Sequence, residues 1–415
     1  MTNANLTEGA ARTPEATLRE VIEHLAPIET LAGSDGERQA AEWIARRLTA
    51  AGASSARVEE ESFFDGYAGL HAKLSAAGAA AGLAGLTRPG RALGAIGGAV
   101  ASVLIADDVS NGPRFARRAL KQERTTWNVV AEAGDLDAER TLVILAHHDA
   151  ARTGKIFASP IQPWLADTFP GIVERIDTSL PQWWGVVGAP AAVAFGSATG
   201  RRRLTAAGAA IGALAAALMA DIASSPIVPG ANDNLTAVAV IVALAEALRE
   251  RPVSGVRVVL ASLGAEEVLQ GGIHGFCKRH LAGMDRERTW VLVPDTVGSP
   301  GLAMLEGEGP IVMEDYYDRS FRDMIARVAD RERIPLRRGM RSRFSTDAVV
   351  PSRMGIPTVA FCSLDRNKAL SNYHLPSDTP ENVRYPTVAL MTDVAELVAR
   401  ELAVPARGAP SHSEG

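Results

Sequence analysis

The chain of 415 residues is long enough to bury a large core, and its 47% apolar and 22% charged residues are typical of a folded protein. A net charge of -5 without a long basic run gives no electrostatic reason to expect nucleic acid as a partner. Cys277 and Cys362 are the only cysteines, which excludes a disulfide framework or a cysteine-built zinc site but leaves one bridge between them open. Residues 1–20 lack the basic stretch and apolar run of an export signal.

The first predicted element is an amphipathic helix over residues 34–52, capped by Ser34 or Asp35 and ended by Gly52. Strand-like apolar runs follow, and helical stretches lie between them. Several runs are apolar without alternation, as expected of strands covered on both faces by helices. We therefore expect an α/β fold with a mixed, largely parallel sheet sandwiched by helices. The predicted strands are 127–133, 142–146, 256–262, 290–293 and 357–362, and the predicted helices are 235–248, 317–329 and 387–402.

Two Ala/Gly-rich apolar stretches, residues 68–108 and 184–223, interrupt this alternation. Each consists of two apolar segments joined by an arginine-bearing turn, which predicts an apolar helical hairpin. The segments are about 69–87 and 92–107 in the first stretch and about 184–199 and 204–223 in the second. We therefore expect a catalytic domain in three parts (1–67, 109–183 and 224–404), the two hairpins as inserts, and a disordered tail at 405–415.

The hairpin segments are at the lower edge of the length that spans a bilayer core of roughly 30 Å. The small-residue spacings Gly78/Gly82 and Gly208/Gly212 suit close packing of membrane helices, so we expect membrane association through both hairpins. In the alternative, a soluble cytoplasmic protein, the Ala-rich helices pack on each other or on a second subunit of a homo-oligomer. The orientation stays open, because arginines occur at the hairpin tips and also after the first hairpin on the catalytic side. These are Arg88, Arg91 and Arg201 to Arg203 at the tips, and Arg114, Arg117, Arg118, Lys121 and Arg124 after the hairpin.

Acidic and histidine side chains follow the ends of the predicted strands or lie in loops before helices, where ligands gather in α/β sheets. Two histidines and three carboxylates suffice to hold a pair of divalent cations, which leaves one carboxylate as a base and one to orient a ligand. Imidazole with carboxylate ligands suits zinc best, with cobalt or manganese as alternatives. The set comprises His147, Asp149, Asp233, Glu266, Glu267, Asp295 and His374.

Each member of this set also has an ordinary structural interpretation. His148 competes with His147 as a ligand, although the spacing to Asp149 favours His147 because a carboxylate commonly fixes the tautomer of a ligating imidazole. Asp233 could be a helix N-cap. Glu266 and its neighbour could be a solvated pair at a helix start. The joint occurrence of the whole set favours a metal site over these separate interpretations.

The set resembles the M28 family of co-catalytic zinc exopeptidases, which includes bacterial leucine-type aminopeptidases. The resemblance covers about residues 128–402 and the N-terminal helix. It rests on HHD at 147–149, GANDN at 230–234, AEE at 265–267, PD at 294–295, TD at 346–347, MGIPT at 354–358 and YH at 373–374. The resemblance implies a zinc-exopeptidase-like fold and two zinc ions. One zinc would be held by His147 and Asp295, the other by Glu267 and His374, with Asp233 bridging them.

The resemblance also implies the remaining roles in an aminopeptidase. A zinc-bound hydroxide would attack the first peptide carbonyl, and Glu266 would act as the general base. Asp149 would orient a ligand, and Tyr373 resembles a tyrosine that steadies the tetrahedral intermediate in some members. The bond from Asp233 to Asn234 would be a cis peptide. The chain departs from the family in the 86 positions between His147 and Asp233, an excess that we attribute to the second hairpin.

Two alternative functions stay open. The first is a carboxypeptidase or amidohydrolase acting on small acyl-amino compounds, with Arg341 and Arg343 as donors to a free carboxylate. The second is a non-catalytic membrane receptor on a peptidase-like domain.

Overall fold

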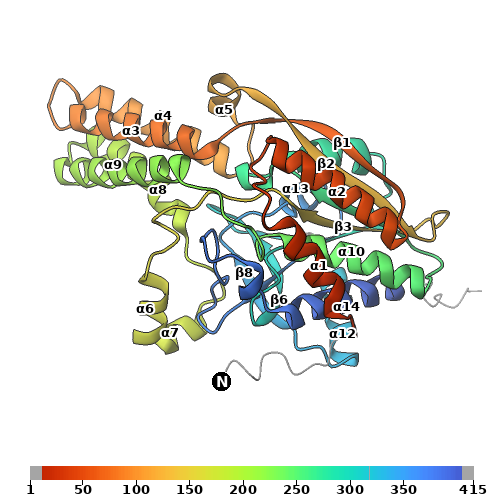
Figure 1. Cartoon of the computed structure of the whole chain (residues 1–415). Coiled ribbons are helices and arrows are strands. Elements are labelled where there is room, and N and C mark those ends of the chain that lie inside the picture. Colours follow the sequence, from red (N-terminus) through yellow and green to blue (C-terminus); the bar gives the residue numbers. More distant parts are fainter. Residues whose placement is uncertain (1–11, 317, 404–415) are drawn as a thin grey trace, which may run out of the picture.

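The computed structural model describes residues 12–316 and 318–403. Within these residues a nine-stranded sheet runs through the centre, with helices on both of its faces (Figure 1). The strand order is β1 (Ser54–Phe64), β2 (Glu123–Gly134), β4 (Arg257–Leu263), β3 (Thr141–His147), β5 (Thr289–Pro294), β9 (Thr358–Leu364), β6 (Gly301–Glu308) and β7 (Glu314–Asp315), and β8 (Arg337–Ser342) also pairs with β6. The predicted α/β fold class is confirmed.

The four central strands β4, β3, β5 and β9 pair in parallel, whereas β1, β2, β6 and β7 join at the edges in antiparallel pairs. Parallel strands end on the same edge of the sheet, so the residues that follow β3, β4 and β5 come close together. Every residue of β3 is buried. Its side chains alternate between two hydrophobic cores, with Leu142 and Ile144 in one and Val143 and Leu145 in the other.

Helices cover both faces of the sheet, which explains the uninterrupted apolar runs of the central strands. On one face lie α1 (Glu15–Leu25), α2 (Asp35–Ala51), α10 (Leu235–Glu250), α12 (Arg319–Arg331) and α14 (Tyr385–Ala403), and on the other lie α11 (Gly272–Phe276), η3 (Cys277–Leu281) and α13 (Val349–Arg353). Ser34 caps α2 by accepting a hydrogen bond from the Glu37 N–H at 3.2 Å, and Gly52 ends it with a left-handed φ of 100°. Tyr317, the predicted first residue of α12, and the predicted tail at 405–415 lie outside the described residues. Cys277 and Cys362 are both free thiols.

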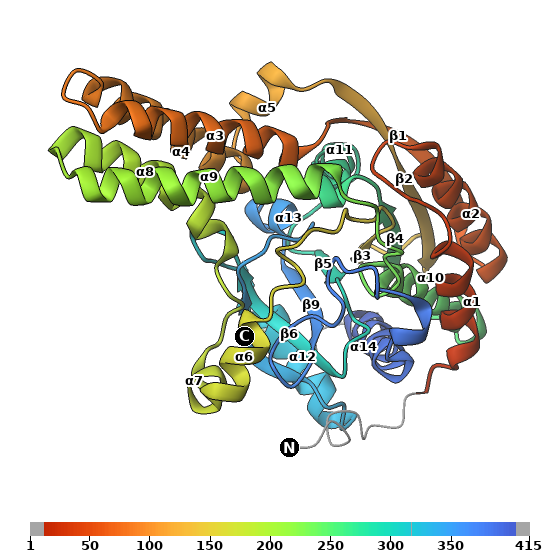
Figure 2. The same cartoon turned by 60° about the vertical axis from the view of Figure 1, so that its left-hand side comes forward.

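The two apolar stretches form helices that pack together as a four-helix bundle. They are α3 (Tyr67–Gly85), α4 (Arg91–Val109), α8 (Gln182–Thr199) and α9 (Arg202–Ser224). Within the bundle α3 packs on α4 and α9, and α8 packs on α4 and α9. Figures 1 and 2 show the bundle projecting away from the sheet, with both hairpin turns at its far end. The two hairpins are therefore halves of one structure.

Small residues line the inside of the bundle. A Cβ atom on Gly82 would lie 2.8 Å from the Ala209 Cβ, and one on Gly98 would lie 2.6 Å from the Pro190 carbonyl oxygen. Large apolar side chains point outward from all four helices. By length and composition, α4 and α9 could each cross a membrane, and 33% of the most apolar window of each is buried. The exposed apolar residues of the bundle include Leu83, Leu93, Ile96, Val100, Val103, Trp184, Phe195, Ile211 and Leu214.

The connection from His147 to Asp233 contains more than the second hairpin. Before α8, residues 150–181 form an extended segment that includes α6 (Ile161–Thr168) and α7 (Pro170–Arg175). The attribution of the excess length to the hairpin alone was therefore wrong. The apolar residues of this segment occur in short groups and show no helical or strand periodicity, so the sequence does not predict its fold.

Candidate metal centre

The structure brings the two candidate histidines and four of the candidate carboxylates together at the edge of the sheet where the parallel strands end. His147 ends β3, Glu266 and Glu267 follow β4 in the short helix η2 (Glu266–Val268), and Asp295 follows β5. Asp233 and His374 reach the same place from the loops before α10 and α14. The histidine Nε2 to carboxylate distances are 3.4 Å (His147 to Asp233), 3.9 Å (His147 to Asp295), 3.9 Å (His147 to Glu266), 3.3 Å (His374 to Asp233) and 3.1 Å (His374 to Glu267).

Asp233 lies between the two histidines. Its Oδ1 faces His147 and its Oδ2 faces His374, so each oxygen of one carboxylate belongs to a different group of ligand atoms. The bond from Asp233 to Asn234 is a cis peptide, as the resemblance implies. Asp233 does not cap the following helix, because the N-cap position of α10 is Asn234. The arrangement is that of a carboxylate placed to bridge two cations.

Two sets of three potential ligands meet at Asp233. The first contains His147 and Asp295, the second contains Glu267 and His374, and within each set the ligand atoms lie within 4.8 Å of one another. These are the same groupings that the resemblance implies. A third set joins Glu266 to His147 and Glu267. The geometry alone therefore does not separate a ligating role from a basic role for Glu266, and both assignments remain predictions.

The geometry distinguishes between His147 and His148 as candidate metal ligands. The His147 Nε2 points toward the carboxylates, while its Nδ1 lies 3.2 Å from the Asp149 carbonyl oxygen and 3.5 Å from the Asp149 carboxylate. His148 instead lies against Ser262, with 2.9 Å between its Nδ1 and the serine Oγ. Burial lowers the pKa of His148 to about 4. His147 is thus the histidine available to a cation.

Asp149 has a structural task beyond contacting His147. Its two carboxylate oxygens accept hydrogen bonds from the backbone N–H groups of Glu266 and Glu267, each at 2.9 Å. The turn that carries these glutamates is unusual, since Ala265 and Leu269 both have left-handed φ angles, of 55° and 68°. Asp149 therefore fixes a strained turn from which two neighbouring side chains reach one centre, as regular strand geometry would not allow.

The electrostatics of the cluster indicate missing positive charge. Burial raises the pKa of Glu267 to about 7 and that of Asp295 to about 6. Burial would lower the pKa of His374, but the carboxylates of Glu267 and Asp233 beside it raise that pKa to about 10. At neutral pH the protein without cations therefore keeps His374 protonated and Glu267 partly protonated, although both groups would ordinarily be mostly deprotonated. A divalent cation at this position would replace those protons.

The buried polar atoms around His374 show whether a metal ion would fit this site. The His374 Nε2 lies 3.1 Å from a Glu267 oxygen and 3.3 Å from an Asp233 oxygen, yet it is buried and makes no hydrogen bond of acceptable geometry. One oxygen of Glu267 is likewise buried without a hydrogen-bond partner. Atoms that converge without bonding one another are expected where each ligates a shared ion. The mixed imidazole and carboxylate donors fit zinc.

Sequence reasoning missed three residues of this region. Asp378 accepts hydrogen bonds from the backbone N–H groups of Asn232 (2.7 Å) and Asp233 (3.1 Å), which fixes the turn that carries the bridging carboxylate. Gln270 donates to the Glu266 carboxylate at 2.8 Å. Asp347, in the TD motif, is buried, and its charge contributes to a pKa of Glu266 well above the usual range, for which burial is the largest cause. The TD motif contributed to the resemblance, but no role was assigned to Asp347, and no spacing in the sequence distinguishes Asp378 or Gln270 from surface polar residues.

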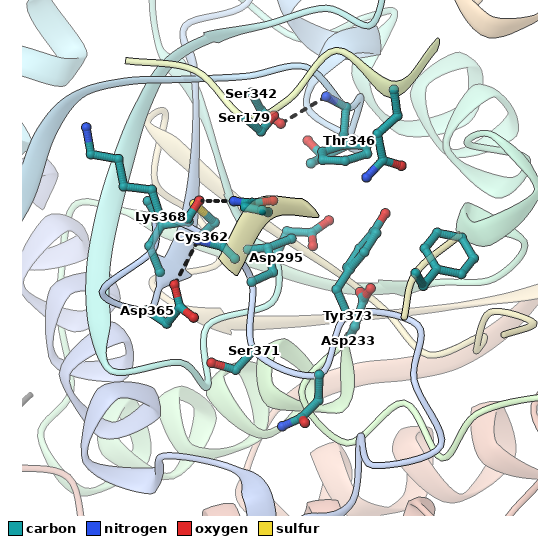
Figure 3. Close-up of a pocket in the computed structure, with 18 of the residues that line it drawn as sticks. Ser179, Asp233, Asp295, Ser342, Thr346, Cys362, Asp365, Lys368, Ser371 and Tyr373 are labelled. Carbon is teal, nitrogen blue, oxygen red and sulfur yellow. Dashed lines mark hydrogen bonds between the residues drawn. The ribbon is translucent and has the colours of Figure 1, made fainter. Parts of the chain in front are cut away.

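A cavity of about 430 Å³ opens beside the cluster. In Figure 3, Asp233, Asp295 and Tyr373 lie on one side of this cavity, with Asp365 and Lys368 opposite. The Tyr373 ring stacks on His374 with 3.9 Å between ring centroids. The segment before α8, whose fold was not predicted, supplies part of the wall. Its lining residues include Phe157, Ser159, Pro160, Gln162 and Ser179.

A smaller cavity of about 80 Å³ lies between the cluster and the base of the four-helix bundle. Glu266, Glu267 and His374 line one side of it. The bundle contributes the apolar residues of the other side, which are Tyr67, Trp183, Val186, Met219 and Ile222. The inserts therefore form part of the wall of the candidate site.

Comparisons with known proteins agree with this description. Residues 214–399 match the model of peptidase family M28. A comparison with curated protein sequences found no match. Among solved structures, the aminopeptidase from Aneurinibacillus sp. strain AM-1 is similar with a TM-score of 0.55, at 15% identity over 98% of this chain and 97% of that chain. A glutaminyl cyclase from Bacteroides thetaiotaomicron gives 0.55, at 10% identity over 94% and 99%. The zinc aminopeptidase BSAP from Bacillus subtilis gives 0.51, at 13% identity over 95% of both chains.

Proposed function

Residues 214–399 match the model of peptidase family M28, and from that premise we propose that this protein is a metal-dependent aminopeptidase that removes the N-terminal residue of peptides. The observation that carries the proposal is the position of Asp233, whose two oxygens face His147 and His374 on opposite sides. We further propose two zinc ions as cofactors, one held by His147 and Asp295, the other by Glu267 and His374, with Asp233 shared. When bound, such a pair polarises the peptide carbonyl and makes a nearby water more acidic.

Glu266 is the group that moves the proton in this proposal. One of its oxygens, Oε1, is held by Gln270 at 2.8 Å, while Oε2 faces the cluster at 3.9 Å from the His147 Nε2. From this position Glu266 accepts a proton from the attacking water and delivers it to the leaving amine. Asp149 keeps the glutamate in place through the backbone, and Tyr373, on the cavity wall, steadies the tetrahedral intermediate.

The cations around the large cavity argue against a free carboxylate as the recognised group. Arg341 is paired with Asp315 at 2.9 Å and with Asp177 at 3.2 Å, and Arg343 lies over the Trp184 ring. The Lys368 ammonium donates to two backbone carbonyl oxygens. These three cations are engaged with partners inside the protein and are not presented to a substrate carboxylate, which argues against the carboxypeptidase alternative.

The decisive measurement compares zinc content and hydrolysis of aminoacyl-anilides in the wild type and in Glu266→Gln. Loss of a general base is expected to reduce kcat by about 10²- to 10⁴-fold without removing zinc. Glu60→Gln, at an exposed position on β1, is the matched control and keeps full activity. Undiminished turnover in Glu266→Gln would refute the assignment.

Blocked substrates separate this function from its alternatives. We expect cleavage of C-blocked dipeptides and none of N-blocked dipeptides, and the reverse result would indicate a carboxypeptidase or amidohydrolase. A peptide with N-terminal glutamine tests the activity named for several similar structures, because cyclisation releases ammonia without cleaving the peptide bond. Purified protein that binds no zinc and cleaves none of these substrates would favour the receptor alternative.

We also propose that the four-helix bundle is embedded in a lipid bilayer. Its exposed apolar residues occur on all four helices, so a second subunit on one side would leave the other sides uncovered. Stretches 74–87, 92–106, 182–200 and 204–220 contain no charged residue. At 1.5 Å per residue they are about 21 to 28 Å long, close to the thickness of a bilayer core. The exposed arginines at the far tip would then lie beyond that core, at its polar surface.

Carbonate-resistant membrane fractionation tests this second proposal. The wild type is expected in the membrane fraction, and a triple substitution of Ile96, Val103 and Leu214 by lysine should move the protein to the soluble fraction. Leu136→Lys is the control, because Leu136 is an exposed apolar residue in the loop between β2 and β3. A wild type that purifies as a monomer without detergent would end the proposal, and a detergent-free dimer would assign the surface to a second copy.

A further inference from the structure

A chain of polar side chains connects the base of the four-helix bundle to Glu266. Arg114, just after α4, donates to the Oδ1 of Asn111. The Asn111 Nδ2 donates to the Oε1 of Gln270 at 2.5 Å, and the Gln270 Nε2 donates to the Oε1 of Glu266 at 2.8 Å. Arg114 and Gln270 are both buried. Two residues in the segment that directly follows the first hairpin, Asn111 and Arg114, are thus connected to the proposed catalytic base through one glutamine.

The direction of these hydrogen bonds is set at the arginine end. A guanidinium has donors only, so the oxygen of the Asn111 amide must face Arg114 and its NH₂ must face Gln270. The Gln270 amide is then forced to turn its oxygen toward Asn111 and its NH₂ toward Glu266. The His274 Nε2, 3.4 Å from the same Asn111 oxygen, reinforces this direction when it carries a proton. Arg114 therefore determines that Gln270 donates a hydrogen bond to Glu266, although Arg114 does not contact the glutamate itself.

Gln270 has no freedom to turn its amide over. The second N–H of its NH₂ group donates to the Ser345 carbonyl oxygen at 2.8 Å, so both donors and the oxygen are engaged. A rotated amide would place its oxygen against a carboxylate and against a carbonyl, losing both interactions. The segment after the first hairpin also holds the backbone beside Gln270, because Arg114 donates to the Leu269 carbonyl oxygen and Arg117 to that of Val268.

We propose that Arg114, Asn111 and Gln270 form a directional hydrogen-bond relay that positions Glu266 for proton transfer, a role that no catalytic motif in the chain specifies. The relay holds Oε1 of Glu266 and leaves Oε2 directed at the metal cluster. All three are positioning residues, since none of them contacts the cluster of metal ligands directly. This inference rests on the proposed aminopeptidase function and makes the segment after the first hairpin a component of its catalytic geometry.

The test is Asn111→Asp, which keeps the size of the side chain but replaces its donor with a second acceptor. Gln270 can then no longer present an oxygen to position 111 and an NH₂ to Glu266 at once. We expect kcat to fall about 10- to 100-fold, with KM and zinc content nearly unchanged, as for loss of a hydrogen bond to a charged group. Asn382→Asp, at an exposed position at the end of the short helix η4 (Pro380–Asn382), where the amide donates to the Ser377 carbonyl oxygen at 2.9 Å, is the matched control. An unchanged kcat in Asn111→Asp overturns the relay.

A double-mutant cycle distinguishes a relay from two independent contributions. Gln270→Met keeps the length of the side chain and removes its hydrogen bonds, so we expect a similar loss of kcat. In the relay, the double variant Asn111→Asp/Gln270→Met is no slower than the slower single variant, whereas independent effects would multiply. Multiplied losses would therefore refute the connection between Asn111 and Gln270.

A measurement that does not depend on turnover separates failure of the relay from failure of the proposed function. In protein labelled with ¹⁵N-glutamine, the Gln270 side-chain amide is assigned by its absence in Gln270→Met. We expect that amide to be protected from hydrogen exchange in the wild type and to lose protection in Asn111→Asp. An inactive wild type with this pattern would refute the aminopeptidase but keep the relay, and an unprotected Gln270 amide in the wild type would refute the relay.

Discussion

The α/β core and the four-helix bundle distribute side chains in opposite ways. In the core, large aliphatic residues such as Ile144, Val238 and Leu260 are fully buried. In the bundle, glycine and alanine fill the interior and large residues such as Ile96 and Leu214 are exposed to 65% and 60%. The core is ordered by exclusion of water, which acts on apolar area. The bundle is ordered by close backbone approach, the pattern expected where the surroundings are themselves apolar.

The largest expected effect comes from removing metal, which acts on the core alone. Chelation with 1,10-phenanthroline should abolish peptide hydrolysis and lower the thermal stability of the sheet domain, by about 2.7 kcal/mol relative to protein at a hundredfold excess over Kd. Calorimetry with and without zinc measures this change. Circular dichroism should show the bundle helices intact, and adding zinc back should restore activity. Bundle helices that melt together with the core would show that the two regions are not independent.

Truncation of an aliphatic side chain should have unequal consequences in the two regions. Leu260→Ala in β4 leaves a cavity in a packed core and should cost about 2 to 5 kcal/mol of unfolding free energy. Leu214→Ala on the outside of α9 should change stability in detergent by less than about 0.5 kcal/mol. Chemical denaturation of both variants in the same detergent measures the difference. Equal costs would mean that Leu214 packs against a partner that the single chain lacks.

In the bundle, adding a methyl group to an interior glycine should be more costly than removing an exposed aliphatic side chain. Gly98→Ala puts a methyl group 2.6 Å from the Pro190 carbonyl oxygen and should cost about 1 to 3 kcal/mol by separating α4 from α8. Gly188→Ala, in α8 with no atom within 4 Å of the new methyl group, should stabilise the helix by about 0.8 to 1 kcal/mol. Thermal melts in detergent compare the two. A tolerated Gly98→Ala would contradict the close packing.

The last effect concerns pH and again separates the regions. Without metal, burial raises the pKa of Glu267 to about 7, and neighbouring carboxylates raise that of His374 to about 10. Both groups carry protons below pH 7, and zinc must displace them. Zinc affinity should therefore rise with pH by at least about tenfold per unit between pH 6 and 8, more steeply below pH 7. Competition titrations with a chelator measure this slope, and a flat profile would contradict it. The helix content of the bundle should stay constant over the same range.

The sequence allowed prediction of those features that depend on local order. Strand ends are visible as apolar runs, so the residues that follow them, His147, Glu266 and Asp295, could be predicted to meet at one edge of the sheet. The hairpins could be predicted because each is a contiguous apolar stretch with a polar turn. The structure adds that the two hairpins join, since α3 packs on α9 across more than a hundred intervening positions.

Other features depend on contacts that no local pattern records. Asn111 and Gln270 are 159 positions apart, and Asp378 lies 145 positions from the Asp233 N–H that it accepts. The residues next to a single amide or aspartate in a loop do not indicate whether its side chain faces water or a catalytic base. The wall formed by residues 150–181 could not be predicted for a related reason, because its short helices bury no residue of their own.

The joining of the two hairpins has a consequence for the order in which the molecule is built during synthesis. Helices α3 and α4 leave the ribosome before β2 and β3, and their partners α8 and α9 follow only after both strands. During that interval Gly82 and Gly98 therefore lack the residues of α8 and α9 against which they pack in the finished bundle. The first hairpin must therefore exist without its partner helices until the second hairpin has been synthesised. Strand β3 likewise lacks its neighbour β4, which is synthesised later still. The relay residue Asn111 can meet Gln270, 159 positions further along the chain, only after α8, α9 and β4 have been synthesised, so the geometry of Glu266 cannot form before those elements exist.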